Sequence, residues 1–315
     1  MPTLKQRTKS KEYRILSFLN ARMELPSKDK KRLSFLEKGY QGEKIFDQLT
    51  VKLQNDLYIL NDLYLEQNES FFQIDTLIIS QHTIFPFEVK NYEGDYRYET
   101  GNFYPKLSKD EINNPLAQLK RSKLHLRPLL KNLGFYLPIE GDVAFVNPNF
   151  TLYQAPLNEP IIHPTQLNNL MKKLNEIPSK LTNRHKMLAD QLVSMHQIDC
   201  PFTRLPHYSY DQLQKGPLCA DCYSLLCFVD ESKKIMVCNK CGHEELVDSA
   251  VLRCVEELEL LFPDMKITTN LVHDWCIVVG SKKTIRRVLM QTISQLEKGI
   301  IGILNKLSDK NTYIS

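Results

Sequence analysis

Side chains that can act on a phosphodiester lie on two consecutive predicted strands. In IFPFEVKN, Glu88 and Lys90 are two residues apart, so both point to one face of an extended strand. Asp75 lies on the preceding strand, FFQIDTLIIS, and the short turn around Gln81 makes the two strands antiparallel neighbours. We therefore expect Asp75 to approach Glu88 across the hairpin.

The two carboxylates are suitable ligands for a hard divalent cation. Mg²⁺ is held in proteins by a few carboxylates together with waters and phosphate oxygens. Such an ion neutralises the phosphate, lowers the pKa of an attacking water and stabilises the leaving oxygen. Asp75 and Glu88 are predicted to bind Mg²⁺ or Mn²⁺, and Lys90 to position or activate the water or to stabilise charge in the transition state.

An E-x-K pair alone is common and usually forms a solvated cross-strand ion pair, so the surrounding residues carry the assignment. Gly42-Glu43, Asp75, Glu88-x-Lys90 and Asn114-Pro115-x-x-Gln118 follow one another in the chain. This order resembles the nuclease-related domain, NERD, a branch of the PD-(D/E)xK nuclease superfamily, over about residues 35–150. The resemblance implies a catalytic set of five residues: Glu43, Asp75, Glu88, Lys90 and Gln118. In that set a helix-borne Glu43 would support the metal, and Gln118 would orient the site or contact phosphate.

The elements that must position these residues are helices and strands of a mixed α/β fold. LSFLEKGYQGEKIFDQLTVKLQ has helical spacing interrupted by Gly39 and Gly42, which places Glu43 in the first turn of a second helix. Four segments from YILNDLYL to GDYRYE predict a β-meander, followed by a helix over about 115–127 and a return strand in GDVAFVNP. The fold implied by the resemblance is a restriction-endonuclease-like mixed sheet flanked by helices. Pro86 inside the ExK strand predicts a strand edge or a bulge.

Four of the eight cysteines have the spacing of a metal site. Cys219-x-x-Cys222, fifteen residues and Cys238-x-x-Cys241 belong to the class in which two thiolate pairs close a tetrahedron around Zn²⁺. The intervening LLCFVDESKKIMVC predicts two short strands with a polar turn, so the module resembles a zinc ribbon. Because four thiolates saturate a tetrahedral ion, the predicted Zn²⁺ is structural. The remaining cysteines lack paired spacing and are predicted to be core residues.

The C-terminal segment ITTNLVHDWCIVVGSKKTIRRVLMQTI predicts a helix, a turn and a helix. Thr268 or Thr269 would cap the first helix, Gly280 would break it, and Ser281 would cap the second. The second helix begins with the four predicted nucleic-acid-binding residues, Lys282, Lys283, Arg286 and Arg287. Two alternatives stay open: the basic side is only solvated, or IVVG is a strand and the tail is a hairpin with a helix.

Prolines and changes in pattern divide the chain into five predicted segments. Pro178 separates two helical stretches, and Pro201, Pro206 and Pro217 mark looser chain before the cysteines. The segments are an N-terminal arm (1–32), a nuclease-like domain (33–155), a helical connector (156–212), a zinc-ribbon-like module (213–247) and a helical C-terminal module with the helix-turn-helix candidate (248–315).

Composition fits a folded protein that can bind nucleic acid. The 315 residues are 42% hydrophobic and 25% charged, which argues against extensive disorder. The chain has 41 basic and 37 acidic side chains, and this small positive surplus permits nucleic-acid binding without requiring it. The first residues lack the apolar region of a secretory signal, and no apolar run approaches the ~20 residues that span a bilayer. We expect a cytoplasmic protein without membrane contact.

The sequence therefore predicts a metal-dependent nuclease that hydrolyses phosphodiester bonds of DNA, with Mg²⁺ or Mn²⁺ at the site and a structural Zn²⁺. One alternative is a catalytically inactive nucleic-acid-binding or DNA-processing accessory protein that uses the zinc ribbon and the basic helix. Another is a regulatory or scaffold protein of a defence or repair operon.

Overall fold

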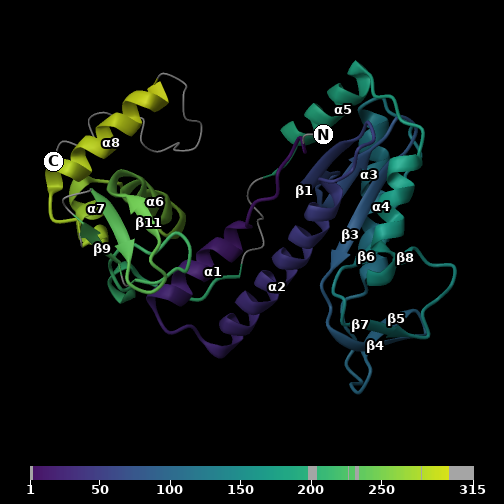
Figure 1. The fold of residues 1–315 in the computed structure, drawn as a ribbon, viewed down its shortest axis with the longest axis horizontal. Helices are drawn as coiled ribbons and strands as arrows, with labels where there is room; N and C mark the ends of the chain where they lie inside the picture. The colour runs from purple at the N-terminus through teal and green to yellow at the C-terminus, as the bar shows by residue number, and fades with distance from the viewer. Residues whose placement is uncertain (1–2, 198–203, 226, 231–233, 278, 298–315) are drawn as a thin grey trace. The chain divides into compact units, whose positions relative to one another are not determined.

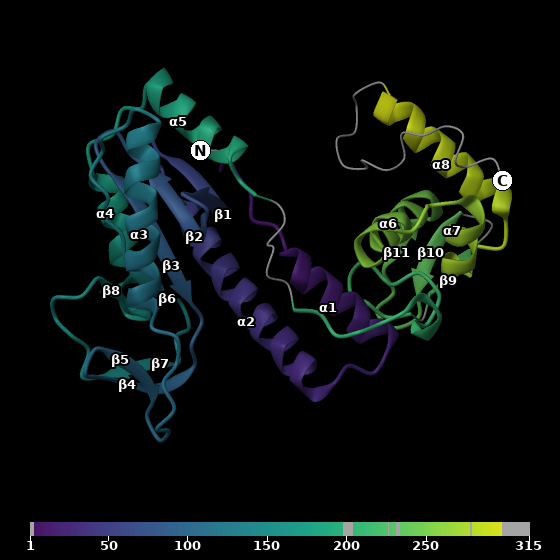
Figure 2. The same ribbon diagram turned by 180° about the vertical axis from the view of Figure 1, so that it is seen from behind.

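The computed structural model describes residues 3–197, 204–225, 227–230, 234–277 and 279–297, without side chains for 293–297. The chain divides into two compact units (Figures 1 and 2). Unit 1 comprises Met1–Lys9 and Ser34–Pro201, and unit 2 comprises Ser10–Leu33 and Phe202–Ser315. The predicted N-terminal arm is thus shared between the units, and the predicted connector falls largely within unit 1.

Unit 1 contains a five-stranded sheet in the order β1-β2-β3-β6-β8. Its strands are β1 (Tyr58–Gln67), β2 (Ser70–Ile79), β3 (Ile84–Lys90), β6 (Val143–Phe145) and β8 (Ile161–Ile162). The first three are antiparallel neighbours, as the predicted meander requires, and β3 pairs in parallel with β6. A mixed sheet flanked by helices is the predicted fold class.

The meander prediction is wrong for its fourth segment. Strand β4 (Gly94–Glu99) leaves the main sheet and joins a three-stranded sheet with β5 (Asn102–Pro105) and β7 (Phe150–Tyr153). Strand β4 begins at Gly94, whose φ of +94° lies in the left-handed region that favours glycine. Strand β4 then pairs in parallel with β7 instead of continuing along β3.

Helices cover both faces of the main sheet. On one face, α2 (Ser27–Thr50) and α4 (Leu167–Glu176) pack against β2, β3 and β6 through a cluster that includes Phe46, Phe87 and Val89. On the other face lie α3 (Pro115–Asn132) and α5 (Asn183–Ser194). A short 3₁₀ turn, η1 (Pro164–Gln166), directly precedes α4 in the chain. Helices α4 and α5, predicted as part of a connector, are therefore core elements of unit 1.

Helix α2 is continuous, so the prediction that Glu43 begins a second helix is wrong. Gly39 and Gly42 both lie inside α2. Gly42 is required there by packing, because a Cβ at this position would lie 2.4 Å from the Cβ of Asn91. Close approach of the helix to the chain after β3, and not a helix break, explains the glycine.

Pro86 lies in a central strand, which the edge-strand rule did not predict. The neighbouring N–H groups of Ile84 and Glu88 donate to Pro138 O and Asp142 O, so the missing Pro86 donor faces the irregular segment that leads into β6. Gly141 permits this arrangement, because a Cβ there would lie 2.0 Å from Pro86 O. Pro86 therefore lies opposite a segment that pairs irregularly with β3, where its lack of an N–H group leaves no ladder hydrogen bond unmade.

Unit 2 combines N-terminal and C-terminal segments. Its elements are α1 (Lys11–Arg22), the 3₁₀ turn η2 (Tyr210–Gln212), β9 (Cys227–Asp230), β10 (Ile235–Cys238), β11 (Glu244–Leu246), α6 (Val247–Leu261), α7 (Thr269–Cys276) and α8 (Lys282–Glu297). The three strands form an antiparallel sheet, as the zinc-ribbon pattern predicts. Arg22 of α1 is fully buried against Glu257, with Nη2 and Oε2 2.6 Å apart. Residues 10–22 therefore form part of the core of this unit.

None of the helices within the described residues is long and apolar enough to cross a bilayer.

The two glycines of α2 give a matched test of this packing. Gly42→Ala is expected to lower the unfolding free energy by about 1–3 kcal/mol, because the added methyl group overlaps Asn91. Gly39→Ala meets no atom within 4 Å and is expected to raise stability by about 0.5–1 kcal/mol through helix propensity. Denaturant unfolding followed by circular dichroism measures both, and equal effects would contradict the packing argument.

Candidate functional site

Strand register places Asp75, Glu88 and Lys90 on one face of the main sheet. Thr76 pairs with Phe87, so Asp75 lies opposite Glu88 one residue further along the antiparallel register. The parallel pairing of β3 with β6 matches Glu88 with Val143 and Lys90 with Phe145. The face that carries Asp75, Glu88 and Lys90 is the face on which α3 packs, opposite to the α2 face that buries Phe87 and Val89.

The three side chains are buried and internally paired. Asp75 and Glu88 are each 7% exposed. Lys90 Nζ lies 2.6 Å from Glu88 Oε1, and the backbone N–H of Val89 donates to Asp75 Oδ2 at 2.7 Å. The structure thus brings together the strand-borne part of the predicted set.

Arg7 is a site residue that sequence reasoning missed. Its guanidinium donates to Glu43 Oε2 at 2.7 Å, to both oxygens of Asp47 at 2.9 Å and to the backbone oxygen of Asp75 at 2.7 Å. The side chain is 1% exposed. No local pattern distinguishes Arg7 from the other basic residues near the N-terminus, so only the tertiary structure reveals it.

The N-terminal segment that carries Arg7 is fixed along β1. Leu4 N donates to Ile59 O and Asn61 N donates to Lys5 O, both at 3.0 Å. Lys5 Nζ adds hydrogen bonds to Asn61 O at 2.9 Å and Asp62 O at 2.6 Å. These bonds direct the chain so that Arg7 reaches α2 and β2 together.

Burial and mutual repulsion raise the pKa values of the acidic groups of the site. Burial, with the charge of Asp75 added, raises the pKa of Glu43 to about 8 and that of Glu88 to about 7. Burial also raises the pKa of Asp75, against the opposing effect of Lys90. Burial disfavours the charge of Lys90, but the neighbouring Glu88 and Asp75 outweigh it and raise the pKa of Lys90. Lys90 is therefore a cation at neutral pH.

The donor set fits a divalent cation bound by two carboxylates. Mg²⁺ typically keeps several waters and takes only one or two protein carboxylates, which are hard oxygen ligands like those of Asp75 and Glu88. Glu43 lies near enough for the charge of Asp75 to raise its pKa, and in this structure its carboxylate accepts from Arg7. Within the described residues, the four cysteines are the only group of three or more acidic, histidine or cysteine donors close enough to share an ion.

The helix opening Asn114-Pro115-x-x-Gln118 is the start of α3. The Asn114 carboxamide oxygen accepts from the N–H groups of Leu116 and Ala117, which makes it the N-cap, and its Nδ2 donates to Gly101 O at 2.7 Å. Gln118 is exposed on α3. Across the described part of the chain, no hydrogen bond joins its side chain to the carboxylates, so its predicted role stays a prediction.

The cysteines of unit 2 form a cluster suited to Zn²⁺. The Sγ atoms of Cys219, Cys222, Cys238 and Cys241 all lie within 4.8 Å of one another. The Cys219–Cys241 and Cys222–Cys238 pairs are 3.6 Å apart, close to the ~3.8 Å between sulfurs of a tetrahedron with Zn–S bonds of about 2.3 Å.

Each cysteine pair forms the same tight turn. The N–H of Asp221 donates to Cys219 Sγ, and that of Lys240 donates to Cys238 Sγ, both at 3.4 Å. Such bonds favour thiolate sulfur, so the cluster is consistent with a structural Zn²⁺. Cys227, Cys254 and Cys276 are buried outside it, as predicted, and Cys200 lies outside the described residues.

The basic residues of α8 are only partly free. Thr268 caps α7 through a bond from Leu271 N, and Ser281 precedes α8, as the sequence predicts. Arg287 pairs with Asp248 at 2.6 Å, and Lys282 donates to Asn270 at 2.9 Å. Lys283 and Arg286 are exposed. Nucleic-acid contact by these residues stays a prediction.

Comparison with known families places part of unit 1. Residues 38–146 match the family described as the nuclease-related domain, NERD. The whole chain has no match among curated proteins or solved structures. The matched range contains the five predicted catalytic residues, whereas Arg7 and the cysteine cluster lie outside it.

Replacement of Arg7 tests its role in the acidic cluster. Arg7→Met is expected to lower the unfolding free energy by about 3–5 kcal/mol, because it leaves Glu43 and Asp47 without their buried cation. Adding Glu43→Gln and Asp47→Asn to Arg7→Met should recover part of the loss. Lys44→Met, an exposed neighbour on α2, should change stability by less than about 0.5 kcal/mol in the same denaturation experiment. A loss of stability in Arg7→Met no greater than that in Lys44→Met would contradict the proposed role of Arg7.

Zinc content tests the cysteine cluster. The intact protein is expected to bind one Zn²⁺ per chain, and Cys238→Ser to lose it, because three thiolates bind Zn²⁺ more weakly than four. Cys227→Ala, buried in the same sheet but outside the cluster, should retain the metal. Elemental analysis of dialysed protein measures this. Full zinc in Cys238→Ser would refute the four-cysteine assignment.

Proposed function

We propose, from the nuclease-related domain formed by residues 38–146, that the protein is a metal-dependent nuclease that hydrolyses phosphodiester bonds of DNA. The observation that carries the proposal is the pair of buried carboxylates, Asp75 and Glu88, on the same sheet face as Lys90. Buried carboxylates in a hydrophobic sheet reduce stability unless they serve a ligand or a reaction.

In this proposal Asp75 and Glu88 bind one Mg²⁺ or Mn²⁺, which would neutralise the phosphate and acidify a bound water. Lys90 is held as a cation by Glu88, so it does not accept the proton of the water. Its ammonium instead stabilises the negative charge that develops on the phosphate oxygens. Glu43 and Arg7 act from α2 and the N-terminal segment by fixing the position of Asp75 through its backbone.

Unit 2 supports a nucleic-acid substrate. Beside the zinc-binding cluster, this unit carries Lys283 and Arg286 exposed on α8, and neither residue has an acidic partner within the described chain. Cations of this kind bind phosphates independently of sequence. We assign DNA as the polymer, with RNA as the comparison in the test.

A second candidate, an inactive accessory protein that binds nucleic acid, has one observation in its favour. Each predicted carboxylate already has an internal partner: Glu43 has Arg7, Glu88 has Lys90 and Asp75 has the Val89 N–H. A cation must displace Lys90 from Glu88, or share that carboxylate with it, before the proposed chemistry can begin.

Cleavage by matched glutamate variants distinguishes the two candidates. With Mg²⁺ or Mn²⁺ the protein is expected to degrade DNA, and Glu88→Gln to reduce the rate more than about a hundredfold, since it removes a ligand charge from the transition state. Glu93→Gln is the control, because Glu93 lies just beyond β3, is exposed and pairs with Lys38. It should stay within about threefold of the parent rate.

The assay compares single- and double-stranded DNA and RNA. Metal-free reactions should use metal-depleted buffer and not a strong chelator, because a chelator would also remove zinc from the cysteine cluster. No cleavage of any substrate by the unsubstituted protein favours the accessory role. Cleavage unaffected by Glu88→Gln rules out the proposed site.

A further inference from the structure

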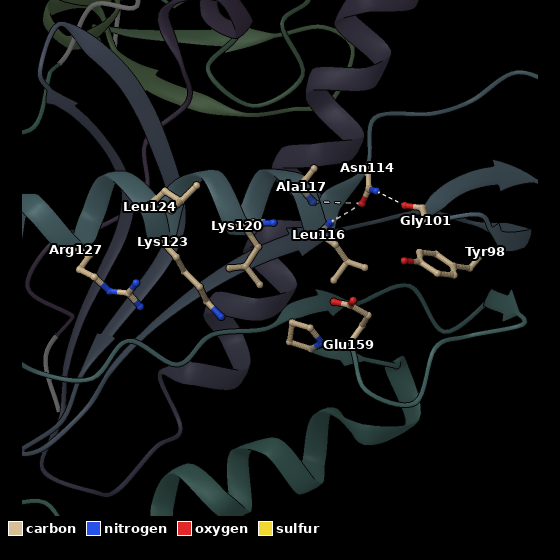
Figure 3. Close-up of a pocket in the computed structure, with 12 residues that line it drawn as sticks. Tyr98, Gly101, Asn114, Leu116, Ala117, Lys120, Lys123, Leu124, Arg127 and Glu159 are labelled. Atoms are coloured by element: carbon tan, nitrogen blue, oxygen red, sulfur yellow. Dashed lines mark hydrogen bonds between the residues drawn. The ribbon is translucent and has the colours of Figure 1, made fainter.

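Beyond the carboxylates, unit 1 contains a basic cavity of about 520 Å³ along α3 (Figure 3). Its wall includes Lys120, Lys123 and Arg127, which are three and four residues apart and so lie on one side of the helix. Figure 3 shows Lys123 and Arg127 extending from α3 on the side where Glu159 lies. The cavity is therefore lined by three cations and one carboxylate.

Two of these cations are available to a ligand. Lys123 Nζ donates to Gly141 O at 2.8 Å. Lys120 and Arg127 are exposed, and their side chains form no hydrogen bond or ion pair with any described residue. They are separated by about 10 Å along the helix axis, given a rise of 1.5 Å per residue. Spaced cations of this kind suit a ligand with more than one negative charge.

Apart from Asn114, the uncharged part of the lining is mainly apolar and aromatic. Leu116, Leu119 and Leu124 contribute aliphatic surface, and Leu124 is 60% exposed. Tyr98 lies at the end of the cavity near Asn114, with its ring packed edge-on against Phe103 at 5.2 Å (Figure 3). Cations combined with an aromatic platform are typical of sites that hold a nucleic-acid strand by its phosphates and bases.

The cavity and the carboxylates belong to the same face of the main sheet. Leu119 lines the cavity and packs in one cluster with Val143 and Phe145 of β6. Those two residues are the register partners of Glu88 and Lys90. A ligand in the cavity is thus on the side of the sheet that carries Asp75, Glu88 and Lys90.

We propose that this cavity binds one strand of the nucleic acid, with phosphates at Lys120 and Arg127 and a base against Tyr98. The proposal rests on the proposed function for its choice of ligand. An acidic peptide would match the cations, but it would make no use of the aromatic end or of the shared sheet face. Glu159 opposes anions locally and leaves an excess of positive charge in the lining.

Binding of a labelled single-stranded oligonucleotide of about 20 nucleotides tests the proposal. All proteins carry Glu88→Gln, so that the strand stays intact, and anisotropy is measured over a range of salt concentrations. Lys120→Gln/Arg127→Gln should weaken binding about tenfold or more. It should also reduce the salt dependence, the slope of log K against log[salt], by about 1.4, since each neutralised phosphate of a single strand contributes about 0.7.

The matched control removes the same two charge types from the same helix outside the cavity. Arg121→Gln/Lys131→Gln should stay within about twofold of the parent affinity, because neither residue lines the cavity. Equal losses in both double variants, or an unchanged salt slope, would overturn the proposal. Displacement of the strand by poly-glutamate as effective as that by unlabelled oligonucleotide would also overturn it.

A cross-link gives a local measurement. Photoreactive p-benzoylphenylalanine at position 124, in the cavity, should cross-link to the strand. The same group at position 107 should not, although Leu107 is 98% exposed. The reverse pattern would contradict the assignment. If Lys120→Gln/Arg127→Gln alone loses binding and the unsubstituted protein cleaves nothing, the cavity proposal stands and the nuclease proposal fails. If the unsubstituted protein cleaves and Lys120→Gln/Arg127→Gln binds normally, the nuclease proposal stands and the cavity proposal fails.

Discussion

Positive charge placed inside an acidic cluster is the condition on which the rest of unit 1 depends. Glu43, Asp47, Asp75 and Glu88 come from three different elements and are brought together largely out of water. Repulsion and lost hydration would oppose this arrangement without internal cations. Arg7 meets the carboxylates on the α2 side, and Lys90 meets those on the α3 side. Helix α2 can therefore pack across the sheet beside acidic strands.

This arrangement links the chemistry proposed for the site to the architecture of unit 1. The segment before α1 packs Leu4 against the core, is bound to β1 by backbone hydrogen bonds, and carries Arg7, which contacts both α2 and β2. A residue outside the matched family range thus sets the electrostatics of residues inside it. Helix α3 has a similar double role, since Leu119 faces both the sheet core and the cavity.

Features encoded in short stretches of sequence were predictable. Alternation at Glu88 and Lys90 gave the correct sheet face, because strand periodicity is two residues and the hairpin turn fixes the register. Cysteine spacing likewise identified a cluster whose geometry depends on two local turns. The pattern of leucines and basic residues also gave the start of α3 near Pro115, where the structure shows Asn114 as the N-cap.

Features that depend on distant contacts were not predictable. Arg7 contacts residues 36 to 69 positions away, and nothing in its neighbourhood records them. Gly42 suggested a helix break, but its purpose is contact with Asn91 across the fold. Pro86 suggested an edge, but Gly141 and the irregular chain before β6 accommodate it in the centre of the sheet. In each case a tertiary contact outweighed a local preference.

The interleaved order of the two units has a consequence for biosynthesis. Arg22 and Glu257, which form a buried pair in unit 2, are 235 residues apart. At about 5–20 residues per second, the ribosome completes Glu257 roughly 10–50 s after Arg22. During that interval residues 34–201, the larger part of unit 1, are synthesised, while Ile15 and Leu19 of α1 lack the α6 residues with which they form one core cluster. Helix α1 therefore reaches its final packing only after α6 has been synthesised.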